Sequence, residues 1–240
     1  MKKENFNKIT TDWYEKSYNK QGFGAQRKYP NEELMRFFGR NYFSIPIELR
    51  QTIKVLEVGC GSCGNLWVIA KEGFDSFGID ISNESINLGE QMLQKWDTKA
   101  SLSVASMTDL PYENNYFDVI CDVYSSYCLN NQQFNEYLEE VKRTLKPGGK
   151  IFSYTPSTKS DAFVNYSPAE KIDSNTLNGI FRESSPYFGN FYPFRFTNPD
   201  EIKTQYGNHG IEINYSELIN RTYNNQSENF QFITLEGTKK

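Results

Sequence analysis

The sequence predicts an α/β fold built on a mainly parallel β-sheet. The main observation lies between residues 51 and 155, where short apolar runs rich in β-branched residues alternate with amphipathic stretches. Strands separated by helices of this length form parallel sheets with right-handed crossovers. The second observation is the length, because 240 residues suit one large α/β domain, or one such domain with an insertion.

Five short runs in this region predict strands. The first run is followed directly by a glycine, and the fourth is apolar enough to be buried on both faces of a sheet. The predicted strands are 53–58, 76–80, 102–104, 117–121 and 150–154. Ligands of parallel sheets bind outside the carboxyl ends of the strands, so the residues that follow each strand are the candidates for function.

Apolar residues at helical spacing predict helices between these strands, at 65–72, 85–96 and 132–145. Pro147-Gly148-Gly149 stops the third helix and leads into the fifth strand. A further helix begins near Asn198-Pro199, and a sixth strand follows it. The segment 156–197 is too long for an ordinary connection, and such segments are usually lids or binding elements.

The composition narrows the class of protein. A formal net charge of −4 with interspersed signs argues against a nucleic-acid partner. No run of about 18 apolar residues is present, and residues 1–5 lack the apolar segment of a signal peptide, so we expect no membrane association. The single histidine, His209, excludes a multi-histidine metal site within one chain, and we expect no metal.

The four cysteines allow two interpretations. Cys60 and Cys63 form a C-x-x-C, which suggests redox chemistry or zinc, but Cys121 and Cys128 lack the spacing of a second zinc-binding pair. The C-x-x-C lies in a glycine-rich stretch, where small residues are needed for backbone reasons. We therefore favour reduced thiols and a cytoplasmic protein.

A glycine-rich segment joins the first predicted strand to the first helix. Gly59, Gly61 and Gly64 make a G-x-G-x-x-G, which alone suggests a dinucleotide site. The preceding Glu57 would repel a pyrophosphate and suits a cationic ligand, such as a sulfonium amino acid with a free ammonium. Asp80 ends the second strand, where a carboxylate accepts both hydroxyls of an adenosine ribose. Since NAD shares this second feature, Glu57 discriminates between the two ligands.

Five segments, in order and spacing, resemble the class I S-adenosylmethionine-dependent methyltransferases. They are residues 55–61, 78–82, 109–112, 116–120 and 145–149. The resemblance implies a Rossmann-like fold with a seven-stranded, mainly parallel sheet, an antiparallel last strand and helices on both faces. It implies an N-terminal helical cap segment at 1–50, and a methyltransferase domain at 51–240 with an insertion at about 156–197.

The resemblance also implies S-adenosyl-L-methionine as the cofactor and assigns residues to it. Glu57 and the glycine-loop backbone would hold the methionine part, Asp80 the ribose hydroxyls, and Ile81 the adenine ring. The implied cofactor-binding residues are Glu57, Gly59, Cys60, Gly61, Asn65, Asp80, Ile81, Ser106, Met107 and Asp122.

Two positions depart from the pattern of the family. Cys63 stands where the family usually has glycine, and its neighbour Gly64 could compensate. Ser106 stands where the family often has an acidic contact to the adenine amino group. That contact would then be made through water or the backbone.

Substrate choice in such folds lies in grafted segments. In the N-terminal segment 11–43, Tyr14 and Tyr18 are candidates to reach the cofactor or the acceptor. The aromatic residues of segment 156–197 predict either a pocket wall for a ring-bearing or sugar-like acceptor or a satellite hydrophobic cluster.

The sequence identifies no catalytic base. Asp122, Tyr124 and Tyr127 follow the fourth strand and are the candidates for catalysis, with Tyr124 also a candidate to bind substrate. His209 follows a helix, at a position that is usually away from the site.

We therefore expect a methyltransferase that acts on an O or N atom of a small polar metabolite, with a sugar or nucleotide-sugar as the suggested acceptor. The partner would be this small molecule, and the protein a monomer or homodimer. Three alternatives stay open: methylation of a protein or RNA, a non-catalytic cofactor-binding module, and a nicotinamide-dependent oxidoreductase.

Overall fold

The structure is a computed structural model that describes residues 3–240, with side chains from Lys8 onward. The signal-peptide expectation rests on residues 1–5, whose side chains lie outside the described part of the chain. Among the described residues, no helix has the length and the apolar character needed to cross a bilayer.

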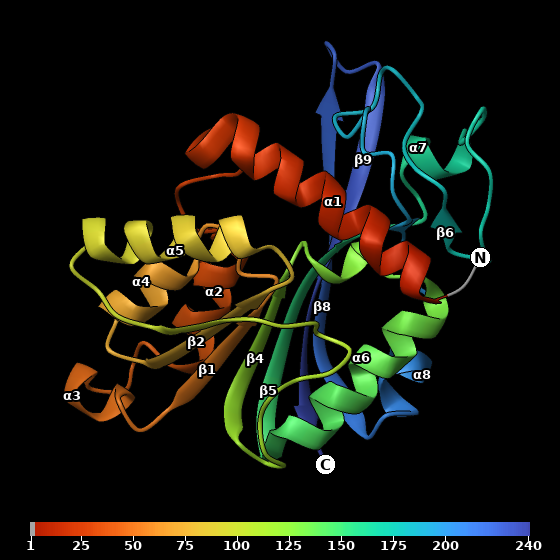
Figure 1. Cartoon of the computed structure of the whole chain (residues 1–240). Coiled ribbons are helices and arrows are strands. Elements are labelled where there is room, and N and C mark those ends of the chain that lie inside the picture. Colours follow the sequence, from red (N-terminus) through yellow and green to blue (C-terminus); the bar gives the residue numbers. More distant parts are fainter. Residues whose placement is uncertain (1–2) are drawn as a thin grey trace.

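A seven-stranded sheet in the order β3-β2-β1-β4-β5-β9-β8 runs through the described chain (Figure 1). The first five strands of this order are parallel, and β9 pairs antiparallel with both β5 and β8. The predicted seven-stranded sheet with an antiparallel last strand is therefore confirmed. The strands are β1 (Lys54–Val58), β2 (Asp75–Asp80), β3 (Ser101–Val104), β4 (Phe117–Val123), β5 (Leu145–Pro156), β8 (Ile211–Tyr223) and β9 (Glu228–Lys239).

Alternate residues of the central strands enter two separate hydrophobic cores. In β1, Val55 packs into the core on one face of the sheet, and Leu56 into the core on the other. The first face is covered by α2 (Glu32–Asn41), α4 (Leu66–Lys71) and α5 (Asn83–Lys95), and the second by α6 (Asn131–Thr144) and α8 (Ile202–Gly207). The central strands thus read as continuous apolar runs because both of their faces are buried.

Side-chain caps set the beginnings of two of these helices. The Ser82 hydroxyl accepts a hydrogen bond from the Ser85 amide at 3.0 Å, so α5 begins two residues earlier than the apolar pattern predicts. Asn130 and Gln133 form a reciprocal capping box at the start of α6. These caps fix where the chain enters α5 and α6. Both points follow the carboxyl ends of strands, where ligands of this fold class bind.

The N-terminal helix α1 (Lys3–Gln21) lies across the carboxyl ends of the strands (Figure 1). Its Glu15 carboxylate accepts hydrogen bonds from the first amides of α5. A short turn, η1 (Gly22–Gly24), follows α1, and the chain then descends to α2. A short helix, α3 (Ile47–Arg50), leads into β1.

The chain between β5 and α8 forms a lobe beside the β8–β9 hairpin, called the inserted lobe below because it contains the segment predicted as an insertion (Figure 1). It contains α7 (Asp161–Val164) and a two-stranded sheet of β6 (Thr176–Leu177) and β7 (Phe194–Arg195). Phe194 and Phe196 of this lobe pack with Phe230 and Phe232 of β9 in the first hydrophobic core. Most aromatic residues of segment 156–197 thus join the core, whereas Phe188 and Phe191 are exposed. Tyr187 and Tyr192 also line a cavity described below.

The predicted turn at Pro147-Gly148-Gly149 differs in detail from the structure. The preceding helix ends at Thr144, one residue before the predicted end, and β5 begins directly at Leu145 instead of at the predicted position 150. Its pairing with β4 is interrupted by a register shift between Phe117 and Val119. The glycines therefore belong to an irregular strand start instead of a free turn.

Candidate functional site

The segment between β1 and α4 turns sharply at Gly59. The backbone there has a φ of +63°, and a Cβ atom would lie 2.4 Å from the Cβ of Ser125. The next amide, of Cys60, donates to the Ile79 carbonyl at 2.9 Å and ties the turn to the end of β2. Both conformation and space therefore require glycine at position 59.

The rest of the turn is shaped by close contact with the chain after α1. A Cβ atom at Gly64 would lie 2.4 Å from the backbone oxygen of Arg27, so this glycine allows two backbone segments to touch. Cys63 has a φ of +60°, a conformation that glycine adopts far more readily, which explains why glycine is expected there. Gly64 does not take over that conformation and serves the close approach instead.

Glu57, the last acidic residue before the turn, is almost completely buried. Its Oε1 accepts a hydrogen bond from Asn65 Nδ2 at 2.6 Å, whereas Oε2 has no hydrogen-bond partner among the described residues. Burial raises the pKa of this carboxyl to about 8, opposed by the Asn65 hydrogen bond and the nearby Arg27 charge. A buried carboxylate oxygen without a partner favours a ligand that brings a positive charge or a donor.

Asp80 ends β2 on the other side of the turn. Its Oδ2 accepts from the Gly61 amide at 2.9 Å, and its Oδ1 accepts from the Ser82 amide at 3.0 Å. Burial raises the pKa of Asp80, and these backbone hydrogen bonds oppose the rise. Each carboxylate oxygen keeps a further lone pair for a ligand.

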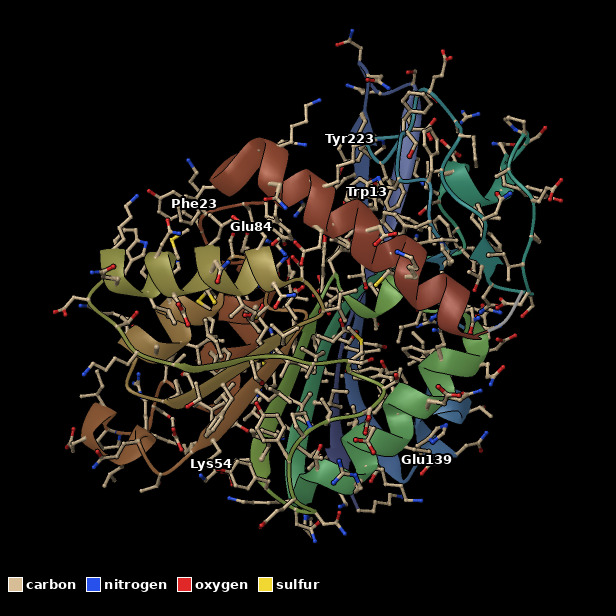
Figure 2. The ribbon with its side chains drawn as sticks, viewed as in Figure 1. Trp13, Phe23, Lys54, Glu84, Glu139 and Tyr223 are labelled. Carbon is tan, nitrogen blue, oxygen red and sulfur yellow. The ribbon has the colours of Figure 1, made fainter. Side chains whose placement is uncertain are left out.

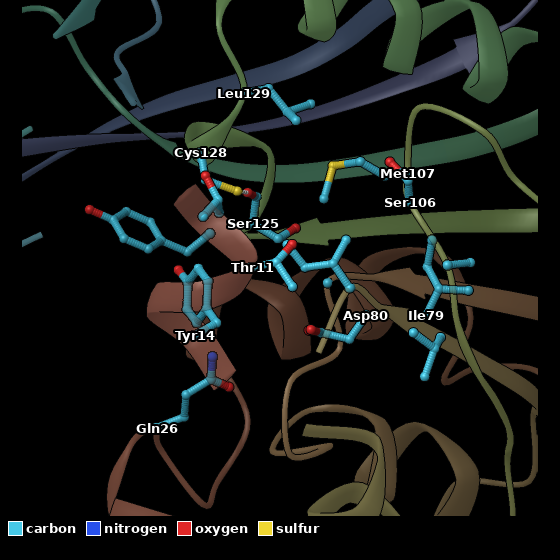
Figure 3. A pocket seen from close by; sticks show the side chains of 16 residues that line it. Thr11, Tyr14, Gln26, Ile79, Asp80, Ser106, Met107, Ser125, Cys128 and Leu129 are labelled. Carbon is cyan, nitrogen blue, oxygen red and sulfur yellow. Dashed lines mark hydrogen bonds between the residues drawn. The ribbon is translucent and has the colours of Figure 1, made fainter. Parts of the chain in front are cut away.

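A first cavity of about 310 Å³ opens beside Asp80 (Figure 3). Its walls are mostly apolar, and in the close-up Asp80, Ile79 and Met107 lie on one side and Tyr14 on the other. The lining residues are Thr10, Thr11, Tyr14, Gln26, Gly59, Ile79, Asp80, Ile81, Val104, Ala105, Ser106, Met107, Tyr124, Ser125, Cys128 and Leu129. A mostly apolar cavity with one carboxylate among its lining residues has the character of a nucleoside site.

A second cavity of about 390 Å³ continues from the first on the other side of Gly59. The two cavities share Tyr14, Gln26, Gly59 and Tyr124. The other residues of the second cavity are Trp13, Ala25, Arg27, Asn31, Glu57, Cys60, Gly64, Asn65, Val123, Tyr127, Tyr154, Tyr187, Asn190, Tyr192, Arg221 and Phe232. Its walls therefore combine a charged end at the glycine turn with an aromatic end.

Three tyrosines at this aromatic end form a hydrogen-bonded ring. The hydroxyl oxygens lie 2.7 Å apart between Tyr14 and Tyr127, 2.7 Å between Tyr127 and Tyr192, and 3.2 Å between Tyr14 and Tyr192. Burial raises the pKa of all three phenols above the usual value. They therefore keep their protons at neutral pH and act as hydrogen-bonding groups, not as bases.

Tyr124 stands at the junction of the two cavities. It follows β4 with a φ of +58°, a rare conformation for a bulky residue, and its ring stacks on that of Tyr187 at a centroid distance of 5.0 Å. The short helix η2 (Ser126–Cys128) then carries Tyr127 into the second cavity. The unusual backbone at Tyr124 thus directs two aromatic side chains toward the same space.

The structure brings most of the predicted site residues together around the two cavities. Those that line a cavity are Tyr14, Glu57, Gly59, Cys60, Asn65, Asp80, Ile81, Ser106, Met107, Tyr124 and Tyr127. Gly61 lines neither cavity, but its amide orients Asp80. These residues belong to or follow β1, β2, β3 and β4, or lie on α1, and these elements converge at the carboxyl edge of the sheet (Figure 1).

Two other candidates, Asp122 and Tyr18, lie away from the cavity surfaces, as does His209. Asp122 is fully buried and accepts hydrogen bonds from the Ser125 and Ser126 amides, so it shapes the turn that carries Tyr124. Tyr18 is buried against the glycine turn and lines neither cavity. His209 lines neither cavity and contacts Glu139, which Figure 2 labels on α6.

Several cavity residues carried no specific signal in the sequence. Gln26 reaches over the glycine turn, with its Oε1 2.0 Å from where a Cβ of Gly61 would stand. Tyr187 and Asn190 come from the inserted lobe, and Arg221 comes from β8. Only the folded arrangement brings these segments to the carboxyl ends of β1 and β4, so no local spacing could predict them.

The comparisons with known proteins agree with this arrangement. Residues 55–149 match a family model described as "Methyltransferase domain". Over 110 residues the chain is 28% identical to sterol 4-C-methyltransferase of Caenorhabditis elegans, a match that covers 45% of this chain and 32% of the relative. It is 30% identical over 190 residues to phosphoethanolamine N-methyltransferase 1 of Triticum aestivum, covering 68% and 37%. The matches therefore span only about a third of these two relatives.

A solved structure shows the same fold over the whole chain. It is the Burkholderia thailandensis 1,6-didemethyltoxoflavin-N1-methyltransferase, with 1,6-didemethyltoxoflavin and S-adenosylhomocysteine bound. The TM-score is 0.62 at 12% identity, and the match covers 100% of this chain and 92% of that one. At this identity the likeness shows the fold alone.

Proposed function

Because residues 55–149 form a class I S-adenosylmethionine-dependent methyltransferase domain, we propose that this chain transfers a methyl group to an O or N atom of a small polar metabolite. The observation that supports it best is the pair of cavities that meet at Gly59 and Tyr124. One has the character of a nucleoside site, and the other offers separate space for an acceptor. Transfer between two bound molecules needs this adjacency.

The residues present fit S-adenosylmethionine. The Oε2 of Glu57 lacks a hydrogen-bond partner among the described residues and suits the ammonium of the cofactor, and the nearby Arg27 suits its carboxylate. Asp80 would bind the ribose hydroxyls, and the adenine would lie against Ile81 in the first cavity. When bound, the cofactor supplies an electrophilic methyl group on a sulfonium.

The contribution of the chain itself is then positioning and exclusion of water. Gly59 keeps the junction of the cavities free of side chains, and the rings of Tyr14 and Tyr124 flank it. The phenols of the second cavity hold their protons at neutral pH, since burial raises their pKa. The accepting atom must therefore be nucleophilic without a base from these tyrosines.

Asp122 contributes to this arrangement indirectly. Its Oδ2 accepts from Ser153 Oγ at 2.9 Å, so both carboxylate oxygens are engaged within the protein. Its role in this proposal is to fix the turn before η2, in place of the direct cofactor contact that the sequence suggested. Tyr124 and Tyr127 then line the acceptor space.

A small acceptor fits the second cavity better than a macromolecule. Its walls come from α1, the inserted lobe and β8, which surround the space on several sides (Figure 2 labels Trp13 and Tyr223 on two of them). Aromatic rings and amides such as Asn190 are what a sugar or nucleotide-sugar would contact. The four free cysteines support the cytoplasmic location in this proposal.

Calorimetry and a transfer assay test this function. We expect the protein to bind S-adenosylhomocysteine and not NAD, and to transfer label from methyl-labelled S-adenosylmethionine to a small-metabolite pool. Label recovered in protein or RNA fractions would favour the macromolecular alternative. Binding without transfer to any pool would favour a non-catalytic module, and binding of NAD alone would overturn the cofactor assignment.

A further inference from the structure

We propose that the methyl acceptor carries a phosphate or carboxylate group, which Arg221 binds at the aromatic end of the second cavity. This inference rests on the proposed function, because it concerns the acceptor of the same site. It narrows the acceptor from a polar metabolite to an organic anion.

Arg221 of β8 is an exposed residue that lines the second cavity, so its guanidinium is accessible to a ligand from solution. Its guanidinium lies 5.7 Å from the centroid of the Phe232 ring, and no hydrogen bond or ion pair joins it to any of the described side chains. By contrast, Arg40, Arg50, Arg143 and Arg182 each contact a carboxylate. A cavity-lining arginine whose five donors are free suits a planar or tetrahedral anion.

Arg221 is the charged group of the second cavity that has no opposite charge beside it among the described lining residues. Glu57 is the one carboxylate among the described lining residues, and it lies at the glycine turn beside Arg27. This pair matches the two charges of an amino acid, which is the methionine end of the cofactor. Arg221 is then left as the charged side chain of the acceptor space, with no acidic neighbour in the lining.

The neighbours of Arg221 would complete an anion site. Its charge opposes the rise in the pKa of Tyr154 and Tyr187 that burial causes, which places the guanidinium near both phenols. Tyrosine hydroxyls and the Asn190 amide are further donors for phosphate or carboxylate oxygens. No carboxylate faces this group from β9 or from the inserted lobe within the described lining.

The arrangement also orients the acceptor. Arg221 lies near Tyr187, the ring of Tyr187 stacks on Tyr124, and Tyr124 stands at the junction with the first cavity. An acceptor held by its anion at Arg221 would extend along these rings and present its other end at Gly59. A compact molecule with an anion at one end and the accepting atom at the other satisfies this geometry.

Calorimetry on the full chain saturated with S-adenosylhomocysteine tests the proposal, with inorganic phosphate and benzoate as separate probes. We expect at least one anion to bind, and Arg221→Gln to weaken it by about tenfold or more. Arg221→Lys should retain part of the affinity. The control Arg36→Gln, at an exposed arginine of α2 paired with Glu32, should change nothing.

Transfer assays with matched acceptors give a second readout. We compare phosphoethanolamine with ethanolamine, and 4-hydroxybenzoate with 4-hydroxybenzyl alcohol, so that phosphate and carboxylate are distinguished. Preference for an anionic member that Arg221→Gln removes supports the proposal. Equal anion affinity in Arg221→Gln, or equal transfer to the neutral members, overturns it. Failure to bind S-adenosylhomocysteine would instead count against the proposed function.

Discussion

Gly59 combines a conformational and a steric requirement at one position. A Cβ atom there would lie 2.4 Å from Ser125, and the backbone has a φ of +63°. We expect Gly59→Ala to lower the affinity for S-adenosylhomocysteine by tenfold or more, because Ser125 or the turn must move. Gly148→Ala is the matched control, since φ is +75° but no atom lies within 4 Å. Equal affinities in calorimetry would mean that the ligand does not approach this turn.

Hydrogen bonds from the backbone amides of Gly61 and Ser82 fix the orientation of the Asp80 carboxylate. We predict that Asp80→Ala weakens cofactor binding by about 1–3 kcal/mol, because charged hydrogen bonds to the ribose are lost. Asp75→Ala, at the other end of β2 and paired with Lys54 at 3.3 Å, is the control. Unchanged calorimetric affinity in Asp80→Ala would contradict the ribose assignment.

Glu57 couples ligand binding to stability. In the folded protein burial raises its pKa to about 8 from 4.5, so between these pH values the folded state holds one more proton than the unfolded state. Stability therefore falls as the pH rises through this window. We predict nearly equal thermal stability for wild type and Glu57→Gln at pH 4.5, and a more stable variant at pH 9, by about 5 kcal/mol.

The same variant should bind the cofactor less well, since an amide does not neutralise an ammonium. Thermal melting across pH, with calorimetry at pH 8, separates the two effects. A stability gap between the two proteins that is independent of pH would show that Glu57 is already ionised in the ligand-free fold. We expect Glu57 to destabilise the ligand-free protein and to strengthen binding of the cofactor.

Among the α-helices of the described chain, α1 is the one that covers both cavities. It contributes Thr10, Thr11 and Tyr14 to the first cavity and Trp13 to the second. A ligand in the first cavity would add buried contact to this helix, so we predict slower amide hydrogen exchange in residues 8–21 when S-adenosylhomocysteine binds. Exchange in α6, which lies under the other face, is the internal control. Equal exchange of α1 in both states would show that it does not cover the ligand.

The elements also differ in how well the sequence predicts them. The central strands could be predicted because residues such as Val55 and Leu56 are both apolar and enter opposite cores. The length of β8 could not, since most of its residues, including Glu217 and Asn220, are exposed and show no alternation. Backbone pairing with β9 along its whole length keeps β8 extended, although its own side chains show no strand pattern.

At the scale of the whole molecule, the cofactor side of the site comes from residues close together in the sequence, whereas the acceptor side comes from segments far apart in it. Glu57, Gly59 and Asp80 belong to two short segments whose spacing predicts their convergence, and the structure brings them together. Arg221 and Tyr187 reach the site only through the β8–β9 hairpin and the inserted lobe. The sequence therefore predicts the cofactor class more readily than the acceptor.

The ring of three tyrosine hydroxyls has a consequence for how the acceptor space opens. Its members come from α1, η2 and the inserted lobe, segments far apart along the chain. In a closed ring every hydroxyl donates once and accepts once, and the circuit can run in either direction. Withdrawing any one segment breaks the circuit and leaves a donor and an acceptor unmet in a desolvated space. The enclosure is thus most stable when all three segments are in place, and the opening of any one segment is opposed by its contacts with the other two.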